Sequence, residues 1–522
     1  MRLQSYLAGR WQDGSGPGSA LVDPVTGATV AVASGDGLDL AEALAYARDT
    51  GGPALRAMSF AERAKLLADI AAVLVENRDR YAEIALQNSG NTAGDAAFDI
   101  DGGIGTLKYY AGLGRKLGDA RTLVEASSDQ LTKDEAFRAI HLWTPVQGVA
   151  VHINAFNFPS WGLWEKAAVS LLAGVPFLAK PATATAWLSY EMVKDVVAKA
   201  GAPAGAISLL CGGGRDLMDR LRPGDVVAFT GSADTALLLR SNPNVLAANI
   251  RFNVEADSLN LCCLGPDVAL DSALFGLFLR EVGRELTVKA GQKCTAIRRV
   301  LVPRERLAAV AEALSAELAK IRVGDPRDPE VRMGPLVSKS QQAAAWEGLD
   351  KLAAEGRIIV GGNRDYAPPG VTADQACFFP PTLLVCEAPG QARAVHEVEV
   401  FGPVATLIPY ASAAEAAALG LKGGGSLVAS VFSGDAGFAA GFAAAIGPAH
   451  GRVLIVNEAV GKSQSGHGVV MPQCVHGGPG RAGGGEELGG LRGLRLYSQR
   501  TAVQGDQAIL AALIEGSATV AL

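Results

Sequence analysis

The sequence predicts an α/β fold with more than one domain. Short apolar runs alternate with amphipathic segments along most of the chain, which is typical of βαβ units and a parallel sheet. The chain has 522 residues, more than a single hydrophobic core usually serves. Its apolar fraction of 49% and charged fraction of 19% are those of an ordinary globular protein. We therefore expect two or three domains, each with its own core.

The first predicted element is a helix that begins after Ser59. Ser59 and Glu62 have the spacing of a capping box, in which each side chain bonds the backbone N–H of the other residue. Five apolar residues follow on one helical face: Leu66, Leu67, Ile70, Val73 and Leu74. This helix is predicted to cover a core.

Buried strands are predicted in two series. The first series comprises residues 147–153, 175–180, 207–210, 225–230, 248–254 and 259–264. Gly, Ser or Thr follows several of these runs, and ligands of open sheets bind at such strand ends. The second series comprises strands near 297–302, 405–410, 426–433 and 452–457, with helices near 273–290 and 305–321. The glycine-rich segment 477–490 is not expected to hold regular structure.

Charge and composition exclude several classes of partner. The net charge of −6 is spread without long single-sign runs, which argues against a nucleic-acid or anionic-membrane surface. No stretch supplies the apolar length of a membrane span or a signal peptide, so we expect a cytoplasmic protein. The seven cysteines contain no CxxC pair. The histidines show no metal-ligand spacing, so no metal is predicted, and all six are interpreted as scattered structural or surface residues: His141, His152, His396, His450, His467 and His476.

Cys294 is the candidate nucleophile, in the segment Gly291-Gln-Lys-Cys-Thr-Ala296. The small residues around it and the flanking Lys289 and Lys293 predict an accessible, electropositive loop, which would lower the pKa of the thiol. The alternative is a half-buried structural thiol, since free cysteine is among the most buried residue types. Neighbouring motifs favour the nucleophile.

An ordered set of motifs resembles the aldehyde dehydrogenase superfamily over nearly the whole chain. The motifs are Asn157-Phe-Pro159, Lys180-Pro-Ala182, Phe229-Thr-Gly-Ser232, Glu255, Gly291-Gln-Lys-Cys294 and Glu399-Val-Phe-Gly-Pro403. The resemblance implies an enzyme that oxidises an aldehyde to a carboxylic acid with a nicotinamide cofactor. It also implies a Rossmann-type cofactor domain, an α/β catalytic domain and a small β oligomerisation arm.

The resemblance assigns three catalytic roles. The Cys294 thiolate attacks the aldehyde, while the Asn157 amide and the Cys294 backbone N–H stabilise the oxyanion. Glu255 is the general base that activates water against the thioester, and an apolar pocket is expected to raise its pKa. Taken alone, Asn157 is equally a turn residue and Glu255 a surface glutamate. The family usually continues Glu-Leu-Gly-Gly, whereas this chain has Glu255-Ala-Asp-Ser258, so the backbone near the nicotinamide is expected to differ.

The cofactor site follows from the same resemblance. Lys180 is expected to bond the adenosine ribose, and Ser232 with the amides after Gly231 to bind the pyrophosphate at a helix N-terminus. Glu399 would bond the nicotinamide ribose, and Phe401 would pack near the ring. The remaining expected cofactor-binding residues are Ile153, Phe156, Ala182 and Thr183. Neutral Thr183 stands where NAD-preferring members carry a glutamate, so NADP is favoured and NAD remains possible.

The expected domain boundaries and oligomeric state also rest on this resemblance. Residues 1–133 and 147–253 would form the dinucleotide-binding domain, and residues 254–493 the catalytic domain. Residues 134–146 and 494–522 would form the oligomerisation element. Its two segments are expected to pair across subunits and bury a sheet edge, which predicts at least a homodimer.

The substrate is less constrained by the sequence. Residues 288–299, 476–481 and 498–504 resemble a branch that handles CoA-linked semialdehydes in the degradation of aromatic compounds. The segment 477–490 would then line the access for a CoA chain, with Arg481 as a phosphate contact, or be a plain solvated connection. A CoA-acylating or a general aliphatic aldehyde dehydrogenase remains open. So do a cysteine hydrolase and a non-catalytic nucleotide-binding protein.

Overall fold

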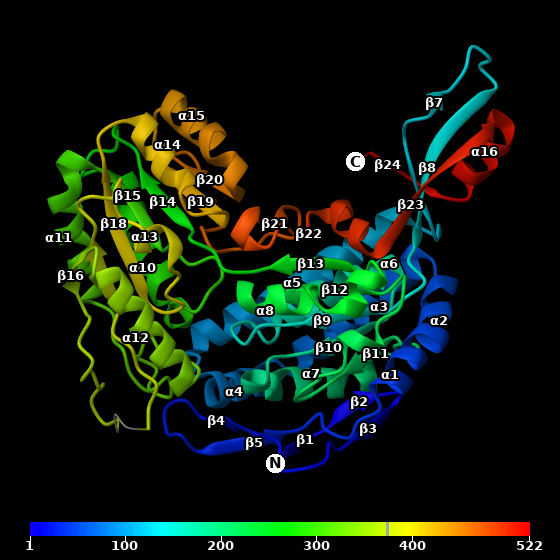
Figure 1. Ribbon diagram of the computed structural model, residues 1–522, viewed down its shortest axis with the longest axis horizontal. Helices are drawn as coiled ribbons and strands as arrows, with labels where there is room; N and C mark the ends of the chain where they lie inside the picture. The colour runs from blue at the N-terminus through cyan, green and yellow to red at the C-terminus, as the bar shows by residue number, and fades with distance from the viewer. Residues whose placement is uncertain (372–374, 522) are drawn as a thin grey trace.

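The computed structural model describes residues 1–371 and 375–521, which form two α/β lobes and a projecting arm (Figure 1). The first lobe contains a sheet in the order β13-β12-β9-β10-β11-β2-β3. Neighbours from β13 to β11 are parallel, and β2 and β3 add antiparallel strands. The strands are β2 (Ser5–Leu7), β3 (Arg10–Gln12), β9 (Ala150–Ile153), β10 (Phe177–Lys180), β11 (Ile207–Leu209), β12 (Val226–Thr230) and β13 (Arg251–Glu255).

Helices cover both faces of this sheet. They are α1 (Leu40–Tyr46), α2 (Gly52–Ala57), α3 (Phe60–Glu76), α4 (Arg78–Ser89), α5 (Ala93–Leu117), α6 (Trp161–Ala173), α7 (Ala186–Lys199), α8 (Ala233–Arg240) and α9 (Pro243–Ala247). The capping box predicted at α3 is confirmed, because Ser59 and Glu62 each accept the other's backbone N–H. The five predicted apolar residues of α3 are all buried. A small sheet of β1 (Arg2–Leu3), β5 (Thr29–Ala33) and β4 (Ser19–Val22) lies at the N-terminus.

The second lobe contains a sheet in the order β16-β17-β18-β15-β14-β19-β20, parallel except for β16. Its strands are β14 (Leu261–Leu264), β15 (Arg299–Pro303), β16 (Arg357–Val360), β17 (Thr382–Val385), β18 (Val404–Tyr410), β19 (Ser426–Phe432) and β20 (His450–Val456). Its helices are α10 (Ala273–Thr287), α11 (Leu307–Leu318), α12 (Lys339–Ala353), α13 (Ala394–Glu397), α14 (Ala413–Leu421) and α15 (Ala436–Ile446). Grouping strand 259–264 with the first series was wrong, because β14 pairs with β15 and β19. The chain changes sheet directly after Glu255.

Each large sheet has a hydrophobic core on both faces. In the first lobe Ala150 and Phe177 belong to one core, whereas the adjacent Val151 and Leu178 belong to another. The second lobe divides in the same way between the neighbours Cys262 and Cys263. Successive residues of a strand point to opposite faces, and parallel strands covered on both sides are apolar throughout. This burial explains why the sequence pattern located these strands.

The arm is a sheet in the order β23-β8-β6-β24, with β7 paired to β8. The strands are β6 (Leu123–Glu125), β7 (Asp129–Gln130), β8 (Phe137–Pro145), β23 (Ser498–Asp506) and β24 (Ala518–Val520), and α16 (Gln507–Glu515) lies against them. Strands β8 and β23 pair along their full lengths within one chain. The expectation that these two segments pair with each other across subunits was therefore wrong.

The glycine-rich segment contains a short hairpin. Strand β21 (Val475–Gly477) pairs with β22 (Glu486–Leu488), and His476 lies opposite Glu487. The expectation that this segment holds no regular structure was wrong, because its ends join the hairpin and Gly480–Ala482 forms a 3-10 turn. Glycines permit the tight packing, since a Cβ atom on Gly485 would lie 2.5 Å from the carbonyl oxygen of Val254. The hairpin thus lies against the end of β13.

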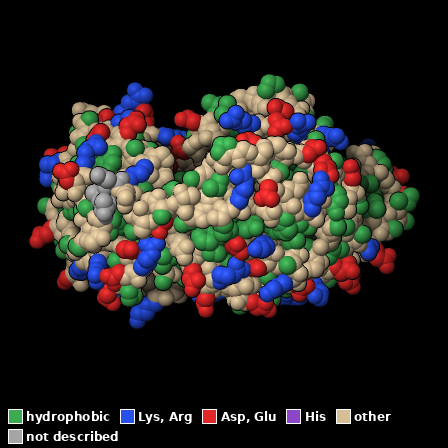
Figure 2. Space-filling view, turned by 90° about the horizontal axis from the view of Figure 1, so that it is seen from below, with side chains coloured by type: hydrophobic (Ala, Val, Ile, Leu, Met, Phe, Trp, Pro, Cys, Tyr) green, Lys and Arg blue, Asp and Glu red, His purple; other side chains and the backbone are tan. Residues whose placement is uncertain are grey.

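The surface carries charges of both signs. On the face in Figure 2, Lys and Arg side chains are interspersed with Asp and Glu side chains. Within the described residues, no helix combines the length and the apolar character that crossing a membrane requires.

Candidate active site

Parallel strand ends of the first lobe form one wall of the site. Strand β12 ends at Thr230 and β13 at Glu255, and the two residues are paired neighbours. The Thr230 hydroxyl lies 3.5 Å from the Glu255 carboxylate, whose residue is only 3% exposed. The carboxyl ends of neighbouring parallel strands meet at one edge of the sheet, so polar residues there converge.

The loop that carries Cys294 is held in a left-handed backbone conformation. After α10, the φ angles of Lys289, Ala290 and Gly291 are 53°, 52° and 67°. Gly291 is required at its position, since a Cβ atom would lie 2.3 Å from the carbonyl oxygen of Gly402. The Arg298 guanidinium donates to the carbonyl oxygens of Gly291 at 2.9 Å and Gly402 at 2.7 Å. These contacts fix the loop before the nucleophile.

Asn157, Glu255 and Cys294 line one small cavity between the lobes. Phe158, Trp161 and Val470 are apolar members of its wall. The remaining lining residues are Ala155, Gly162, Glu165, Thr230, Thr295, Gly468 and His476. The structure therefore brings together the three predicted catalytic residues, although they are far apart in sequence.

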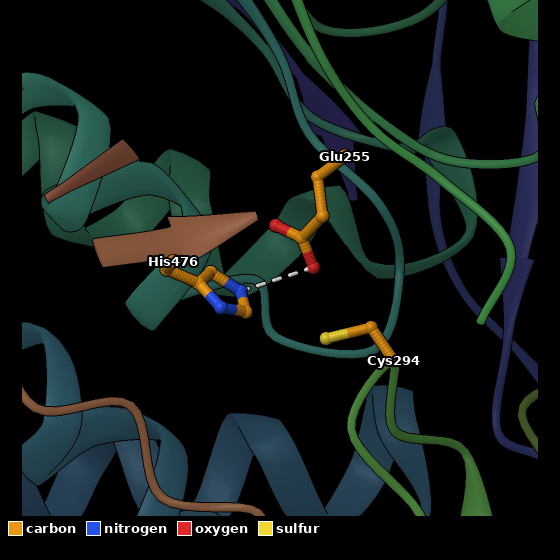
Figure 3. A group of neighbouring side chains, drawn as sticks. All are labelled: Glu255, Cys294 and His476. Carbon is orange, nitrogen blue, oxygen red and sulfur yellow. Dashed lines mark ion pairs between the residues drawn. The ribbon is translucent and has the colours of Figure 1, made fainter. Parts of the chain in front are cut away.

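His476 is a member of the site that the sequence analysis missed. Its Nε2 atom lies 3.2 Å from Oε1 of Glu255, and both side chains are 4% exposed (Figure 3). The Cys294 sulfur, a Glu255 oxygen and a His476 nitrogen lie within 4.8 Å of one another. The interpretation of His476 as a scattered structural or surface residue was wrong. No spacing motif pointed to it, because the hairpin β21–β22 alone brings it to Glu255.

The pKa of Glu255 is shifted in the direction opposite to that expected. Burial raises its pKa, but the charge of the adjacent His476, with smaller contributions from Lys166 and Cys294, lowers it to about 2. The sequence analysis expected an apolar pocket to raise this pKa. That expectation was wrong because charged partners outweigh desolvation at this carboxylate.

The setting of Cys294 also differs from the expectation. Lys293 pairs with Glu285 at 2.6 Å, and the Lys289 backbone N–H donates to Asp95 at 2.8 Å. Both lysines are buried beside acids, so they do not make the loop electropositive. Burial and the nearby Glu255 carboxylate raise the pKa of the Cys294 thiol well above its ordinary value. The half-buried thiol is therefore protonated and needs a base, which Glu255 can supply.

Lys180 ends strand β10 at the same sheet edge. It is partly buried, and burial lowers its pKa. No carboxylate in the described part of the chain pairs with it. Ile153 ends the neighbouring strand β9, and Ala182 and Thr183 begin the turn after β10. A cation without an acidic partner, at the carboxyl ends of parallel strands, fits an anionic dinucleotide such as NAD(P).

The N-terminus of α8 is capped by protein side chains. Ser232 is the N-cap, as predicted, and accepts from the Thr235 backbone N–H. The Asp257 carboxylate accepts from the Ala233 backbone N–H at 3.0 Å. Asp257 belongs to the segment that departs from Glu-Leu-Gly-Gly, so this departure places an acid beside the expected pyrophosphate position. Arg481, which was expected to contact a phosphate of CoA, instead forms an ion pair with Asp257 at 3.1 Å.

Glu399 and Phe401 reach the site from the second lobe. Glu399 accepts from the Ser258 backbone N–H at 3.0 Å, and its carboxylate lies 3.5 Å from Arg298. Burial raises the pKa of Glu399 to about 7, although Arg298 partly offsets this effect. The Phe401 ring packs edge-on against Phe156, with 5.7 Å between centroids. These contacts join the two lobes across the expected nicotinamide position.

Known proteins resemble this chain in sequence and in fold. The model of the aldehyde dehydrogenase family matches residues 11–503. The 3,4-dehydroadipyl-CoA semialdehyde dehydrogenase of Aromatoleum evansii is 53% identical over 92% of this chain and 93% of that protein. A putative aldehyde dehydrogenase from Burkholderia cenocepacia is 26% identical with a TM-score of 0.82, covering 97% of both chains. Betaine aldehyde dehydrogenase from Staphylococcus aureus, in complex with NAD+, is 24% identical with a TM-score of 0.83, covering 97% of this chain and 95% of that one.

Proposed function

The chain belongs to the aldehyde dehydrogenase family, and from this premise we propose that Cys294, Glu255 and Asn157 carry out its reaction. That reaction is the NAD(P)-dependent oxidation of an aldehyde. The observation that supports these residue roles is their convergence on one cavity: a thiol, a carboxylate and an amide face the same small space. Those are the groups that nucleophilic attack, proton removal and oxyanion stabilisation require.

The first step is attack by sulfur. Glu255 takes the proton of the Cys294 thiol, and the sulfur bonds to the aldehyde carbon to form a thiohemiacetal. The side-chain amide of Asn157 and the backbone N–H of Cys294 stabilise the oxygen that becomes negative. The left-handed turn and Arg298 hold the sulfur in place during this attack.

The cofactor-binding residues orient the acceptor. When bound, the nicotinamide accepts hydride from the carbon attached to sulfur. Lys180 would hold the adenosine ribose and Ser232 the pyrophosphate, while Glu399 and Phe401 would hold the nicotinamide ribose and ring. Asp257, which caps α8, must share that helix end with the pyrophosphate or move away from it.

Hydrolysis of the thioester completes the reaction and distinguishes two classes of enzyme. Glu255 lies close enough to the sulfur to draw a proton from a water that attacks the thioester carbon. This favours release of a carboxylic acid. In the alternative, a CoA-acylating enzyme, free CoA resolves the thioester and the product is an acyl-CoA.

The substrate we propose is a CoA-linked semialdehyde of aromatic-compound degradation, such as 3,4-dehydroadipyl-CoA semialdehyde. The 53% identity to the Aromatoleum evansii enzyme over nearly both chains supports this choice. A wide groove beside the catalytic cavity also supports it, because Trp161 and Val470 line both. Gly105 gives one side of the groove a surface without a side chain, and Arg284 supplies a cation for phosphate.

We further propose NADP as the preferred cofactor, with NAD possible. Thr183 is neutral, and Lys180 is a cation without an acidic partner in the described part of the chain. The positive charge of Lys180 attracts the 2′-phosphate that distinguishes NADP from NAD, and the neutral Thr183 does not repel it. We also propose a homodimer, because the outer edge of β23 is unpaired among the described residues and can accept another strand.

One experiment tests class, substrate and cofactor together. The enzyme is supplied with free and CoA-linked semialdehydes and with NADP or NAD, and the reduced nicotinamide and the acid product are measured. The proposal predicts highest kcat/KM for the CoA-linked compound with NADP, and acid formation without free CoA. A requirement for free CoA, or equal use of short aliphatic aldehydes, would contradict it.

A further inference from the structure

His476 lies where it can control the general base. It extends from β21, whose partner β22 packs against the end of β13, so that its imidazole lies beside the Glu255 carboxylate. The same imidazole lines the catalytic cavity with Cys294. A histidine that only filled space would not need its Nε2 atom 3.2 Å from the carboxylate oxygen.

Two further buried carboxylates lie beside this pair. Oxygen atoms of Glu165, Glu255 and Glu487 lie within 4.8 Å of one another. The Lys166 ammonium contacts Glu165 at 3.2 Å and Glu487 at 3.1 Å, and its side chain is 1% exposed. Burial raises the pKa of Glu165 to about 7, which reduces its charge near neutral pH, but one buried cation still cannot balance the charges of Glu255 and Glu487 at low dielectric. Protonated His476 is the cation closest to Glu255 that completes the balance.

The charged groups that face His476 come from every element packed around it. They are Glu255 from β13, Glu165 and Lys166 from α6, Glu487 from β22, and Arg452 from β20. Burial lowers the pKa of His476, but Glu255 and then Glu165 raise it above the ordinary 6.5, against a smaller opposing effect of Arg452. The carboxylates that the imidazolium neutralises therefore stabilise its protonated form.

Given the roles proposed above for Cys294 and Glu255, we propose that His476 is a positioning residue whose charge sets when Glu255 can act as the base. Protonated His476 holds the Glu255 carboxylate ionised beside the thiol and makes it a weak base. Loss of the His476 proton leaves the carboxylate without its cation and raises its basicity. Hydrolysis of the thioester therefore follows the protonation state of His476.

The step that His476 controls is hydrolysis of the thioester, which proceeds in two stages. The water oxygen bonds to the thioester carbon while one water proton moves to a Glu255 oxygen. The C–S bond then breaks, the carboxylic acid leaves, and the Cys294 thiolate takes the proton back from Glu255. His476 exchanges its own proton with solvent and does not bond to the substrate.

The test compares wild type with His476→Gln, which keeps a polar side chain but carries no charge, and with His476→Phe, which keeps an aromatic ring. The rapid burst of reduced nicotinamide and the steady-state kcat are both measured across pH. We expect a burst near one equivalent per active site in wild type and His476→Gln, with turnover at low pH about tenfold higher in the variant, because no imidazolium weakens Glu255 there. In the plot of kcat against pH, the acid limb of His476→Gln is expected to lie about one pH unit or more from that of wild type. A nearby charge produces shifts of this size.

A matched control and a second background separate the possible failures. His141→Gln removes a partly exposed histidine of the arm that pairs with Glu125 at 3.6 Å, and should leave the limb unchanged. In a Glu255→Gln background, adding His476→Gln should cause no further shift, because His476 acts through Glu255. If His476→Phe misfolds, the Gln variant still decides the outcome.

The results have distinct meanings. An acid limb that coincides in wild type and His476→Gln would overturn the role of His476 while leaving the nucleophile and base intact. A loss of burst and turnover by the same factor, with an unmoved limb, would show a merely structural role and would also overturn it. Wild-type turnover in Glu255→Gln alone would instead overturn the proposed base.

Discussion

The side-chain amide of Asn260 donates a hydrogen bond of 2.8 Å to the carbonyl oxygen of Cys294. The same nitrogen donates to the carbonyl oxygen of Ala296 at 3.0 Å, and the Asn260 side-chain oxygen accepts from the Val428 backbone N–H at 3.0 Å. Asn260 is fully buried. It thus ties the nucleophile loop to the second sheet, and the sequence analysis gave it no role.

Replacing Asn260 should loosen the nucleophile loop. Asn260→Asp keeps an acceptor for Val428 but sets an oxygen against the Cys294 carbonyl, which removes the donor and adds repulsion. We expect a loss of about 2 kcal/mol in the free energy of unfolding and a fall of about tenfold in kcat. Denaturant unfolding and steady-state kinetics measure both, and Asn363→Asp in an exposed turn is the matched control. Unchanged kcat in a destabilised Asn260→Asp would limit Asn260 to a structural role.

Removing the nucleophile or the oxyanion donor should affect turnover to different degrees. Cys294→Ala should abolish nicotinamide reduction, because no other sulfur among the described residues lines the cavity. Asn157→Ala should lower kcat by about 10²–10³ while the protein stays folded, since one oxyanion donor is lost. Circular dichroism checks the fold of both variants. Turnover of Asn157→Ala within about twofold of wild type would mean that other donors stabilise the oxyanion.

The parts of the fold that the sequence predicted are those with local signals. The strands that lead to Lys180, Thr230 and Glu255 are apolar runs buried on both faces, and the α3 capping box depends on residues three positions apart. Family motifs named Asn157 and Cys294, which the structure brings to one cavity.

The rest depended on contacts between distant segments. His476 and Glu255 meet only because β22, the partner of β21, packs against the end of β13. The direction of the Glu255 pKa shift followed from that contact, so no local pattern could indicate it. The flanking Lys293 looked like a source of positive potential, but its partner Glu285 lies on the preceding helix and cancels the charge. Division of the chain into functional domains stays a prediction.

Cofactor preference should respond to one charge at Thr183. Thr183→Glu sets a carboxylate where the 2′-phosphate of NADP is expected, so like charges repel there. We expect the ratio of kcat/KM for NADP to that for NAD to fall about tenfold or more. Thr183→Gln is the uncharged control and should change the ratio little. The same ratio in Thr183→Glu and wild type would place the discrimination elsewhere.

The Glu255–His476 pair should make stability depend on pH. The folded pKa of Glu255 is about 2, below its ordinary 4.5, so its contribution is present above 4.5 and is lost as pH falls towards 2. The folded pKa of His476 lies above its ordinary 6.5, so its contribution is present below 6.5 and is lost as pH rises through the folded value. The pair is therefore strongest between these two ordinary values.

Denaturant unfolding of His476→Gln checks this window. At about pH 5.5 the variant should lose about 3 kcal/mol relative to wild type, because a buried carboxylate keeps its charge without a partner. At about pH 9 the difference should be smaller, since wild-type His476 is then losing its own charge. A difference that is constant with pH would mean that packing, and not charge, links His476 to its neighbours.

The central claim is that Cys294 forms a thioester that Glu255 helps water to hydrolyse, and mass spectrometry of Glu255→Gln tests it most directly. The variant is mixed with NADP and the aldehyde, quenched in acid and digested. Removing the Glu255 charge also removes one cause of the raised pKa of Cys294, so the thiol can lose its proton to solvent in this variant. We predict that the peptide containing Cys294 gains the mass of the acyl group and keeps it after the aldehyde is exhausted, whereas wild type loses the adduct. An unmodified Cys294 peptide in Glu255→Gln, together with wild-type acid production, would contradict the account.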